Sequence, residues 1–95
     1  MPDSEPCFVY VLGCAHKGRC STYVGWTLDI DRRLAQHNAG SGARSTRGRV
    51  WELIYVEPCA SRREAMSREW HLKRDRAFRQ KKLRDWTQTR LIGHQ

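Results

Sequence analysis

Apolar residues along this chain follow two different spacings, and together these predict six secondary-structure elements. Short runs rich in β-branched and aromatic residues predict strands over residues 7–12, 21–26 and 51–56. Apolar residues that recur every three or four positions predict helices over about 28–37, 61–73 and 75–86. The expected order is therefore β-β-α-β-α-α, which indicates an α/β (α+β) domain.

The first two strands are expected to form a hairpin, because His16-Lys17-Gly18-Arg19 supplies turn residues between them. If the turn centres on Lys17 and Gly18, we expect Tyr10 directly opposite Tyr23. Directly opposed residues of an antiparallel pair share a face, so both phenols are expected to project from one side of the sheet. The alternative is that the two tyrosines are ordinary strand aromatics that pack under a helix.

The predicted helix over 28–37 has Ile30 and Leu34 as its apolar stripe. Arg33 and His37 are four residues apart, so they are expected on one ridge beside that stripe. We interpret His37 as a proton relay or phosphate contact. The alternative is a histidine that only interacts favourably with the dipole at the helix C-terminus.

The predicted helix over 61–73 begins with a capping box, in which Ser61 is followed three residues later by Glu64. Its apolar residues are Ala65, Met66, Trp70 and Leu72. Glu69 falls inside that stripe, where a carboxylate is costly unless it is paired or bound to a cation. We therefore interpret Glu69 as a metal ligand. The alternative is a routine surface ion pair with Lys73, one turn further on.

The length of 95 residues is that of one domain. We expect a folded domain over 7–86, a flexible tail over 1–6 and a C-terminal tail over 87–95. No apolar run approaches the roughly 18 residues of a membrane span. The N-terminus has no signal character. A cytoplasmic protein without membrane contact is expected.

The strongest clue to a partner is the charge. Eighteen Lys and Arg against ten Asp and Glu give a net charge of +8 and a pI near 9.9, which favours nucleic acid as the partner. The Gly-rich segment 38–43 leads into the basic stretch 44–49, which is read either as a mobile linker or as a phosphate contact. The expected nucleic-acid contacts are Arg32, Arg44, Arg47, Lys73 and Arg76.

The four cysteines do not predict a zinc site. Cys14 and Cys20 lie near each other and near His16, but there is no C-x-x-C pair, and Cys59 is distant in sequence. Without a secretion signal, reduced thiols are the default. We expect small buried thiols.

Five residues stand out from the apolar pattern by their chemistry. They are Tyr10, Tyr23, Arg33, His37 and Glu69. Phosphodiester cleavage needs a group that takes a proton from water, a cation that stabilises charge on the phosphate oxygens, and a carboxylate that holds a hard metal ion. These residue types together predict that chemistry.

The same residues carry a resemblance to the GIY-YIG nuclease superfamily. Val9-Tyr10-Val11, followed after eleven residues by Tyr23-Val24-Gly25, resembles its paired tripeptides. Arg33 follows ten residues after Tyr23, and Glu69 resembles the superfamily's metal-binding glutamate. The similarity extends over residues 7–82. It is greatest to small stand-alone members and to catalytic domains of structure-specific and excision-repair endonucleases.

The resemblance implies a three-stranded antiparallel sheet flanked by helices. It also implies one Mg²⁺ or Mn²⁺ bound through Glu69, and hydrolysis that leaves 5′-phosphate and 3′-hydroxyl ends. The function expected from it is that of a metal-dependent endonuclease acting on DNA, branched or single-stranded forms included, with DNA repair as a family-level role. A protein partner stays open.

Two other functions stay open. One is a nucleic-acid-binding module whose nuclease site is idle or depends on a partner, and the other is a scaffold domain with incidental basic charge.

Gly25 is expected to permit close backbone approach, with a bulge as the alternative. Arg32, beside Arg33, is expected to be a solvated or phosphate-contacting residue.

Overall fold

A curved three-stranded antiparallel sheet separates two helices and gives the molecule its layers. The computed structural model describes the backbone of residues 6–93 and the side chains of residues 6–89. Its strands are β1 (Cys7–His16), β2 (Arg19–Thr27) and β3 (Glu52–Cys59), in the sheet order β2-β1-β3. Its helices are α1 (Ile30–Asn38), α2 (Arg62–Arg74) and α3 (Arg76–Gly93), with a short 3-10 turn at Arg44–Thr46.

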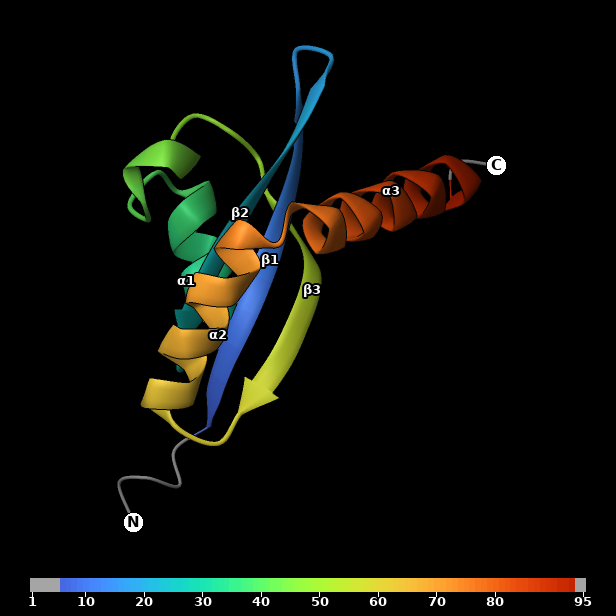
Figure 1. Cartoon of the computed structure of the whole chain (residues 1–95). Coiled ribbons are helices and arrows are strands. Elements are labelled where there is room, and N and C mark those ends of the chain that lie inside the picture. The colour runs from blue at the N-terminus through green and yellow to red at the C-terminus, as the bar shows by residue number, and fades with distance from the viewer. Residues whose placement is uncertain (1–5, 94–95) are drawn as a thin grey trace.

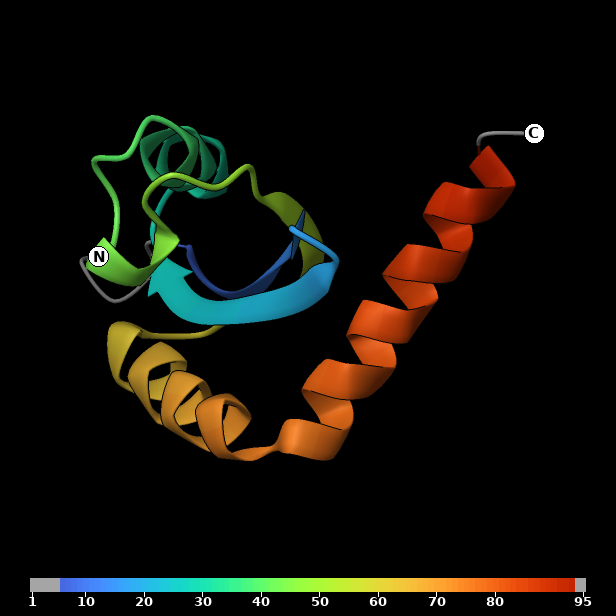
Figure 2. The same cartoon turned by 90° about the horizontal axis from the view of Figure 1, so that it is seen from above.

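The predicted element order and the antiparallel sheet are both confirmed. Helix α1 lies on one face of the sheet and α2 on the other, while α3 turns away from the end of α2 (Figures 1 and 2). Strand β3 continues through Pro58 to Cys59, beyond the expected end at residue 56. It can do so because β3 is an edge strand, where the missing N–H of a proline leaves no ladder bond unmade on the open side.

The register of the β1–β2 hairpin differs from the expected one by two residues. Tyr10 pairs with Gly25, and Tyr23 pairs with Leu12. Lys17 and Gly18 both have positive φ, 51° and 77°, so they form the whole of a two-residue turn. Partners across such a turn have residue numbers that add up to 35. A shift of two residues preserves the face, so Tyr10 and Tyr23 still project from the same side.

The sheet packs a separate apolar cluster against each face. On the α2 side, buried strand residues such as Val9, Val11 and Val24 pack with Ala65 and Leu72. On the α1 side, the cluster contains Tyr10, Leu12, Cys14 and Trp51, with Tyr23, Ile30, Leu34 and Leu53 at its margin. The tyrosines therefore belong to the α1 layer, which also carries Arg33 and His37.

The connection between α1 and β3 is fixed at both ends by side-chain hydrogen bonds. Asn38 closes α1 and bonds both backbone groups of Trp51, through Nδ2 at 3.1 Å and Oδ1 at 2.7 Å. The indole N–H of Trp51 donates to the carbonyl of Thr46 at 2.9 Å. The segment is thus held against the α1 layer, which brings Thr46 close to α1.

Helix α2 buries a narrower stripe than its sequence indicated. Ala65 and Leu72 are buried as expected, whereas Met66 and Trp70 are 50% and 53% exposed. The start of the helix is capped as expected, because the Ser61 hydroxyl accepts from the Glu64 N–H at 3.1 Å. The two exposed side chains lie on a flank of α2 that the sheet does not cover.

The corner between α2 and α3 is held by Arg79. Its guanidinium donates to the carbonyls of Leu72 and Lys73, both at 3.0 Å, and to the hydroxyl of Thr22 at 3.3 Å. Arg79 therefore satisfies the last carbonyls of α2, which have no partner within the helix. The first residue of α3 follows Asp75, whose side chain accepts from the N–H of Phe78.

Helix α3 continues to Gly93, so the expected end of this helix at residue 86 is wrong, and α3 extends into the segment expected as a C-terminal tail. Its last turns project away from the sheet (Figures 1 and 2). Residues 94–95 and residues 1–5 of the expected N-terminal tail lie outside the described residues. The sequence pattern missed this extension because residues 87–89 are all polar and give no apolar periodicity.

The four cysteines are free thiols. Cys7, Cys14 and Cys59 are buried as expected, whereas Cys20 is exposed.

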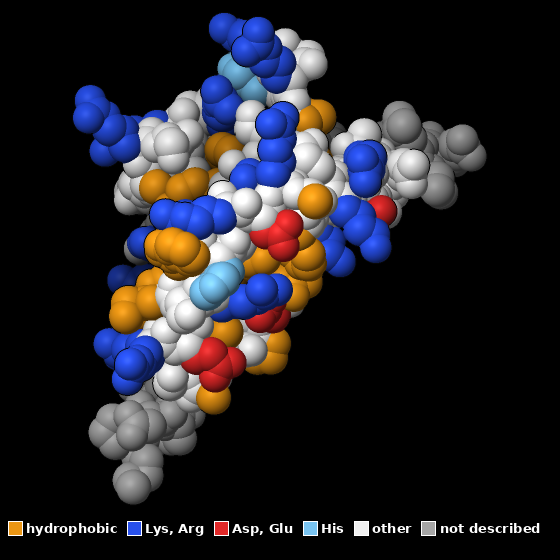
Figure 3. Space-filling view, in the orientation of Figure 1, with side chains coloured by type: hydrophobic (Ala, Val, Ile, Leu, Met, Phe, Trp, Pro, Cys, Tyr) orange, Lys and Arg blue, Asp and Glu red, His pale blue; other side chains and the backbone are white. Residues whose placement is uncertain are grey.

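No helix within the described part of the chain is long and apolar enough to cross a membrane. Lys and Arg side chains are spread widely over the face shown in Figure 3, and acidic side chains are few there.

Candidate active site

Two tyrosines and a histidine form an aromatic cluster between β1, β2 and α1. The ring centroids of Tyr10 and Tyr23 are 6.4 Å apart. The ring of His37 lies 6.0 Å from that of Tyr10 and 4.8 Å from that of Tyr23. The hairpin supplies the phenols on one face, and the last turn of α1 places the imidazole over them.

A chain of hydrogen bonds defines the protonation state of His37. The Thr46 hydroxyl donates to the carbonyl of Ala43 at 2.7 Å, so its oxygen is left to accept a proton from His37 Nδ1, 2.8 Å away. With Nδ1 protonated in the neutral ring, Nε2 carries the lone pair. Nε2 lies 2.9 Å from the Tyr10 hydroxyl, which therefore donates to it. Tyr10 is bonded to an unprotonated base.

Burial keeps all three groups of the cluster neutral. It raises the pKa of Tyr10 to about 12, although the neighbouring Arg33 guanidinium acts in the opposite direction. It also raises the pKa of Tyr23, again against Arg33. The pKa of His37 is lowered, first by burial and then by the positive charge of Arg33. A neutral imidazole does not act as a cation toward the helix C-terminus, which removes the basis of the dipole interpretation.

Two residues of this cluster were missed by sequence reasoning. Thr46 is fully buried and orients His37, yet it lies within the basic stretch, where only the arginines drew notice. Gly42 faces the same ring: a Cβ on Gly42 would lie 2.5 Å from His37 Nδ1. The signal available in the sequence was the pair Ser45-Thr46 within a segment that runs from Gly42 to Gly48, which is too common a pattern to be specific.

Gly25 makes room for the side chain of Tyr10. A Cβ at position 25 would lie 2.4 Å from the Tyr10 hydroxyl oxygen, closer than real contacts allow. The expected close approach is therefore present, and the group that approaches is the phenol on the neighbouring strand. The observed register thus explains why the Tyr-Val-Gly motif ends in glycine: a larger residue at position 25 would clash with the Tyr10 side chain.

Arg33 lies on the same side as the phenols and is partly buried. Its Nη1 donates to Gln36 at 3.2 Å, while its buried Nε has no partner among the described residues. Arg32 is exposed. Both arginines line a groove of about 420 Å³ at the junction of β2 and α1. A buried guanidinium N–H without a protein partner, at the wall of a groove, suits a phosphate oxygen.

Glu69 reaches this region from the opposite layer. Its side chain is 24% exposed, and its carboxylate oxygen lies 3.7 Å from Lys73 Nζ, one turn further along α2. The negative charge of Glu69 contributes to raising the pKa of both Tyr10 and Tyr23. Glu69 lies at the margin of the buried stripe, not inside it. Its ion pair with Lys73 is also present.

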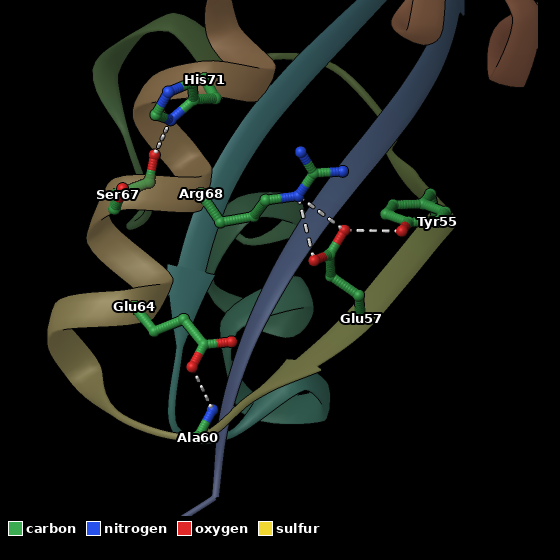
Figure 4. A network of polar contacts seen from close by, with 7 residues as sticks. All are labelled: Tyr55, Glu57, Ala60, Glu64, Ser67, Arg68 and His71. Atoms are coloured by element: carbon green, nitrogen blue, oxygen red, sulfur yellow. Dashed lines mark hydrogen bonds and ion pairs between the residues drawn. The ribbon is translucent and has the colours of Figure 1, made fainter.

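Other nearby acids are engaged elsewhere. Glu57 accepts from Arg68 Nε at 3.0 Å and from the Tyr55 hydroxyl at 2.6 Å (Figure 4). Glu64 accepts from the backbone N–H of Ala60 at 3.3 Å, so it caps α2 (Figure 4). Within the described residues, no three His, Cys, Asp or Glu side chains are grouped as a metal site. One carboxylate fits Mg²⁺ or Mn²⁺ if water and substrate phosphate supply the other oxygens.

The structure brings together some of the expected site residues and leaves others apart. Tyr10, Tyr23, Arg33 and His37 lie in one layer, with Glu69 acting on the phenols from α2. The expected nucleic-acid contacts are all exposed side chains. They are Arg32 on α1, Arg44 and Arg47 at the 3-10 turn, Lys73 on α2 and Arg76 at the start of α3.

Comparisons with known proteins point to one family. The model of the GIY-YIG catalytic domain matches residues 6–83. A UPF0213 protein of Clostridium perfringens is 43% identical over 68 residues, which are 70% of this chain and 70% of that protein. A UPF0213 protein of Streptococcus pneumoniae is 50% identical over 68 residues, 70% of this chain and 66% of that protein.

A longer match is found in Oceanobacillus iheyensis. Its UPF0213 protein is 38% identical over 80 residues, 83% of this chain and 90% of that protein. No solved structure matches the chain significantly. The names of these relatives state no activity.

Proposed function

Because this chain belongs to the GIY-YIG catalytic domain family, we propose that it is a divalent-metal-dependent endonuclease that hydrolyses phosphodiester bonds in DNA. The family implies a nuclease whose substrate is nucleic acid, and its members generally use divalent metal ions. The proposal of metal-dependent DNA hydrolysis is supported by the charged groups that act on the two phenols. Tyr10 and Tyr23 share a face, and the charges of Arg33 and Glu69 both act on their hydroxyls.

Glu69 is proposed to hold Mg²⁺ or Mn²⁺. A bound divalent ion supplies charge stabilisation to the phosphate and lowers the pKa of a coordinated water. A single carboxylate binds such an ion weakly until phosphate oxygens join it, so metal and DNA are expected to bind together. Lys73 would then lose its partner and become free to contact phosphate, which agrees with its half-exposed position.

Tyr10 is proposed to receive the proton of the attacking water. Its high pKa means that it is a neutral phenol near pH 7, so it must lose its own proton as it accepts another. The hydrogen bond to His37 Nε2 gives that proton a destination. The Nδ1–H of His37, bonded to Thr46, keeps the ring in the tautomer that can receive it. One proton enters the pair from water, and His37 becomes the imidazolium.

Arg33 is proposed to clamp the scissile phosphate, and Tyr23 to orient it. The unpartnered Nε of Arg33 can donate to a phosphate oxygen, and a guanidinium stabilises the charge that grows on those oxygens. Tyr23 is less buried than Tyr10 and faces the same cluster. Its hydroxyl is therefore placed to contact water or phosphate, while Tyr10 is placed to contact His37.

The decisive experiment is cleavage of a panel of single-stranded, duplex and branched DNAs with Mg²⁺, with Mn²⁺ and with EDTA. We expect cleavage only with metal. Glu69→Gln keeps the shape of the side chain and removes its charge, so cleavage should fall by at least about 100-fold while folding and DNA binding persist. Glu64→Gln is the matched control on the same helix, because Glu64 caps α2 away from the phenols.

Arg33→Ala separates a phosphate clamp from a metal ligand. It should abolish cleavage and weaken DNA binding slightly, whereas Glu69→Gln should leave binding equal or tighter, because a negative charge near phosphate is removed. If wild-type protein binds DNA but cuts none of the panel, the chain is a binding module with an idle site. If Glu69→Gln unfolds the protein, or cleaves normally, Glu69 is a structural partner of Lys73.

A further inference from the structure

Trp70 is a large aromatic side chain left half exposed on α2. It is 53% exposed even though the guanidinium of Arg74 covers part of it, with the Cζ atom of Arg74 3.7 Å from the ring centroid. Nη1 of Arg74 also donates to the carbonyl of Trp70 at 3.0 Å, which fixes the stack. A fully buried tryptophan would contribute far more to stability, so this side chain is not placed for the core.

The exposed indole belongs to a strip that begins at Glu69. Successive residues of an α-helix advance by about 100° around its axis. Around α2 the order is therefore Glu69, Lys73, Met66, Trp70 and Arg74. The buried residues Ala65 and Leu72 lie on the other side of Glu69. Glu69 thus separates the packed face of α2 from an exposed strip that is both apolar and basic.

Figure 3 shows the same character on the surface. Hydrophobic side chains on the flank of α2 lie beside Lys and Arg side chains, with few acids near them. Met66 is 50% exposed and adds apolar area next to Trp70. An apolar ring that has an arginine guanidinium against it, on a strip that also carries Lys73, is complementary to a ligand that has flat aromatic groups and negative charge.

We propose that Trp70 and Arg74 form a stacking subsite for an unpaired base of the nucleic-acid strand that passes Glu69. This rests on the proposed function, which places the scissile phosphate at Glu69. Stacking on an aromatic ring accepts any base, and an arginine at the ring adds a cation for the adjacent phosphate. A base within a duplex is paired and stacked between its neighbours, so only an unpaired base is free to occupy the subsite.

The test is binding in EDTA, where metal-dependent cleavage cannot intervene. Fluorescence anisotropy compares a single-stranded oligonucleotide with a blunt duplex of the same length. Trp70→Ala should weaken single-strand binding by roughly tenfold or more, the size of a lost base–aromatic stack, with duplex binding unchanged. Trp70→Phe should restore most of the affinity, whereas Trp70→Leu should not, since leucine keeps apolar area without a ring.

Val56→Ala is the matched control. Val56 is an exposed apolar residue on β3, and its replacement removes apolar area without an aromatic ring. It should leave both affinities unchanged. The variants at position 70 should keep the salt dependence of wild type, because no charge is altered, and their thermal unfolding should match it, because the side chain is half exposed.

The outcomes separate this inference from the proposed function. If Trp70→Ala binds single strands as tightly as wild type, the subsite is wrong, whether or not the protein cleaves DNA. An equal loss for single strand and duplex overturns it too, since a duplex interior offers no free base. If binding depends on Trp70 but no metal supports cleavage, the nuclease proposal fails and the subsite stands.

Discussion

The hydroxyl of Tyr10 and the ring of His37 are buried against each other, and each is held neutral by that burial. With a pKa of about 12, the Tyr10 phenol is protonated near neutral pH, so by itself it is a poor base. Bonded to an unprotonated imidazole, it can pass its own proton on as it accepts one. At the scale of single residues, the proposed proton transfer therefore needs both Tyr10 and His37.

A pair that acts as one unit predicts non-additive losses. Tyr10→Phe and His37→Gln should each lower the single-turnover cleavage rate by about 100-fold or more, and the double variant should lose little beyond either single one. Single-turnover rates in Mg²⁺ measure this directly. Multiplicative losses in the double variant would mean that the two residues act independently.

The lowered pKa of His37 predicts a pH dependence of stability. As the pH falls below the usual histidine value of about 6.5, the unfolded chain takes up a proton that the folded chain does not. The free energy of unfolding contributed by this residue is complete above pH 6.5. It is lost as the pH falls from there through the lower folded pKa.

Urea unfolding at pH 7.5 and pH 5.5 measures that loss. Wild type should lose more stability between these pH values than His37→Gln, which lacks the titrating ring. His16, His71 and His94 are common to both proteins, so their contribution cancels in the comparison. An identical loss in the two proteins would show that His37 titrates with an ordinary pKa.

At the scale of elements, the segment between α1 and β3 does two tasks. Its inner side holds Thr46 against His37 and the Trp51 indole, and its outer side exposes Arg44 and Arg47. The inner contacts fix where the outer charges lie. The basic stretch is therefore an ordered arm of the α1 layer, which holds its arginines beside the last turn of α1.

This placement predicts that the two arginines contribute more to DNA binding than charge alone. Replacing Arg44 and Arg47 by Glu changes the net charge from +8 to +4, because each replacement removes one positive charge and adds one negative charge. Affinity should fall for all DNA sequences alike. Lys17→Glu with Arg19→Glu, at the hairpin tip, makes the same net change and should cost less. Equal losses would indicate that only net charge matters.

At the scale of the whole molecule, the net charge of +8 is expected to dominate the proposed association with DNA. Each phosphate contact releases counterions, so the logarithm of the binding constant should fall linearly with the logarithm of salt concentration. Titrations between 50 and 200 mM salt in EDTA should show a steep slope, shallower for the Arg44 and Arg47 variant. A flat response would favour a scaffold domain with incidental charge.

Much of the fold follows from local patterns. The alternation of apolar residues in the strands and their helical spacing elsewhere are properties of neighbouring positions, so the element order was predictable. The shared face of Tyr10 and Tyr23 was also predictable, because side chains alternate with a period of two. The expectation that they lie directly opposite each other was wrong, because the turn at Lys17 and Gly18 pairs residues whose numbers add up to 35, which puts Gly25 opposite Tyr10 and Leu12 opposite Tyr23.

The sequence by itself determined the residue types, the element order, the basic charge and the five chemical groups on which the nuclease proposal depends. Only the tertiary structure decided the partners of those groups. Tyr10 meets His37 across 27 positions of sequence, and Thr46 reaches His37 through a connection that no periodicity describes. The tertiary structure also left Trp70 outside the core, because the sheet covers only a narrow stripe of α2. Such contacts depend on how packed layers meet, and spacing along the chain does not encode that.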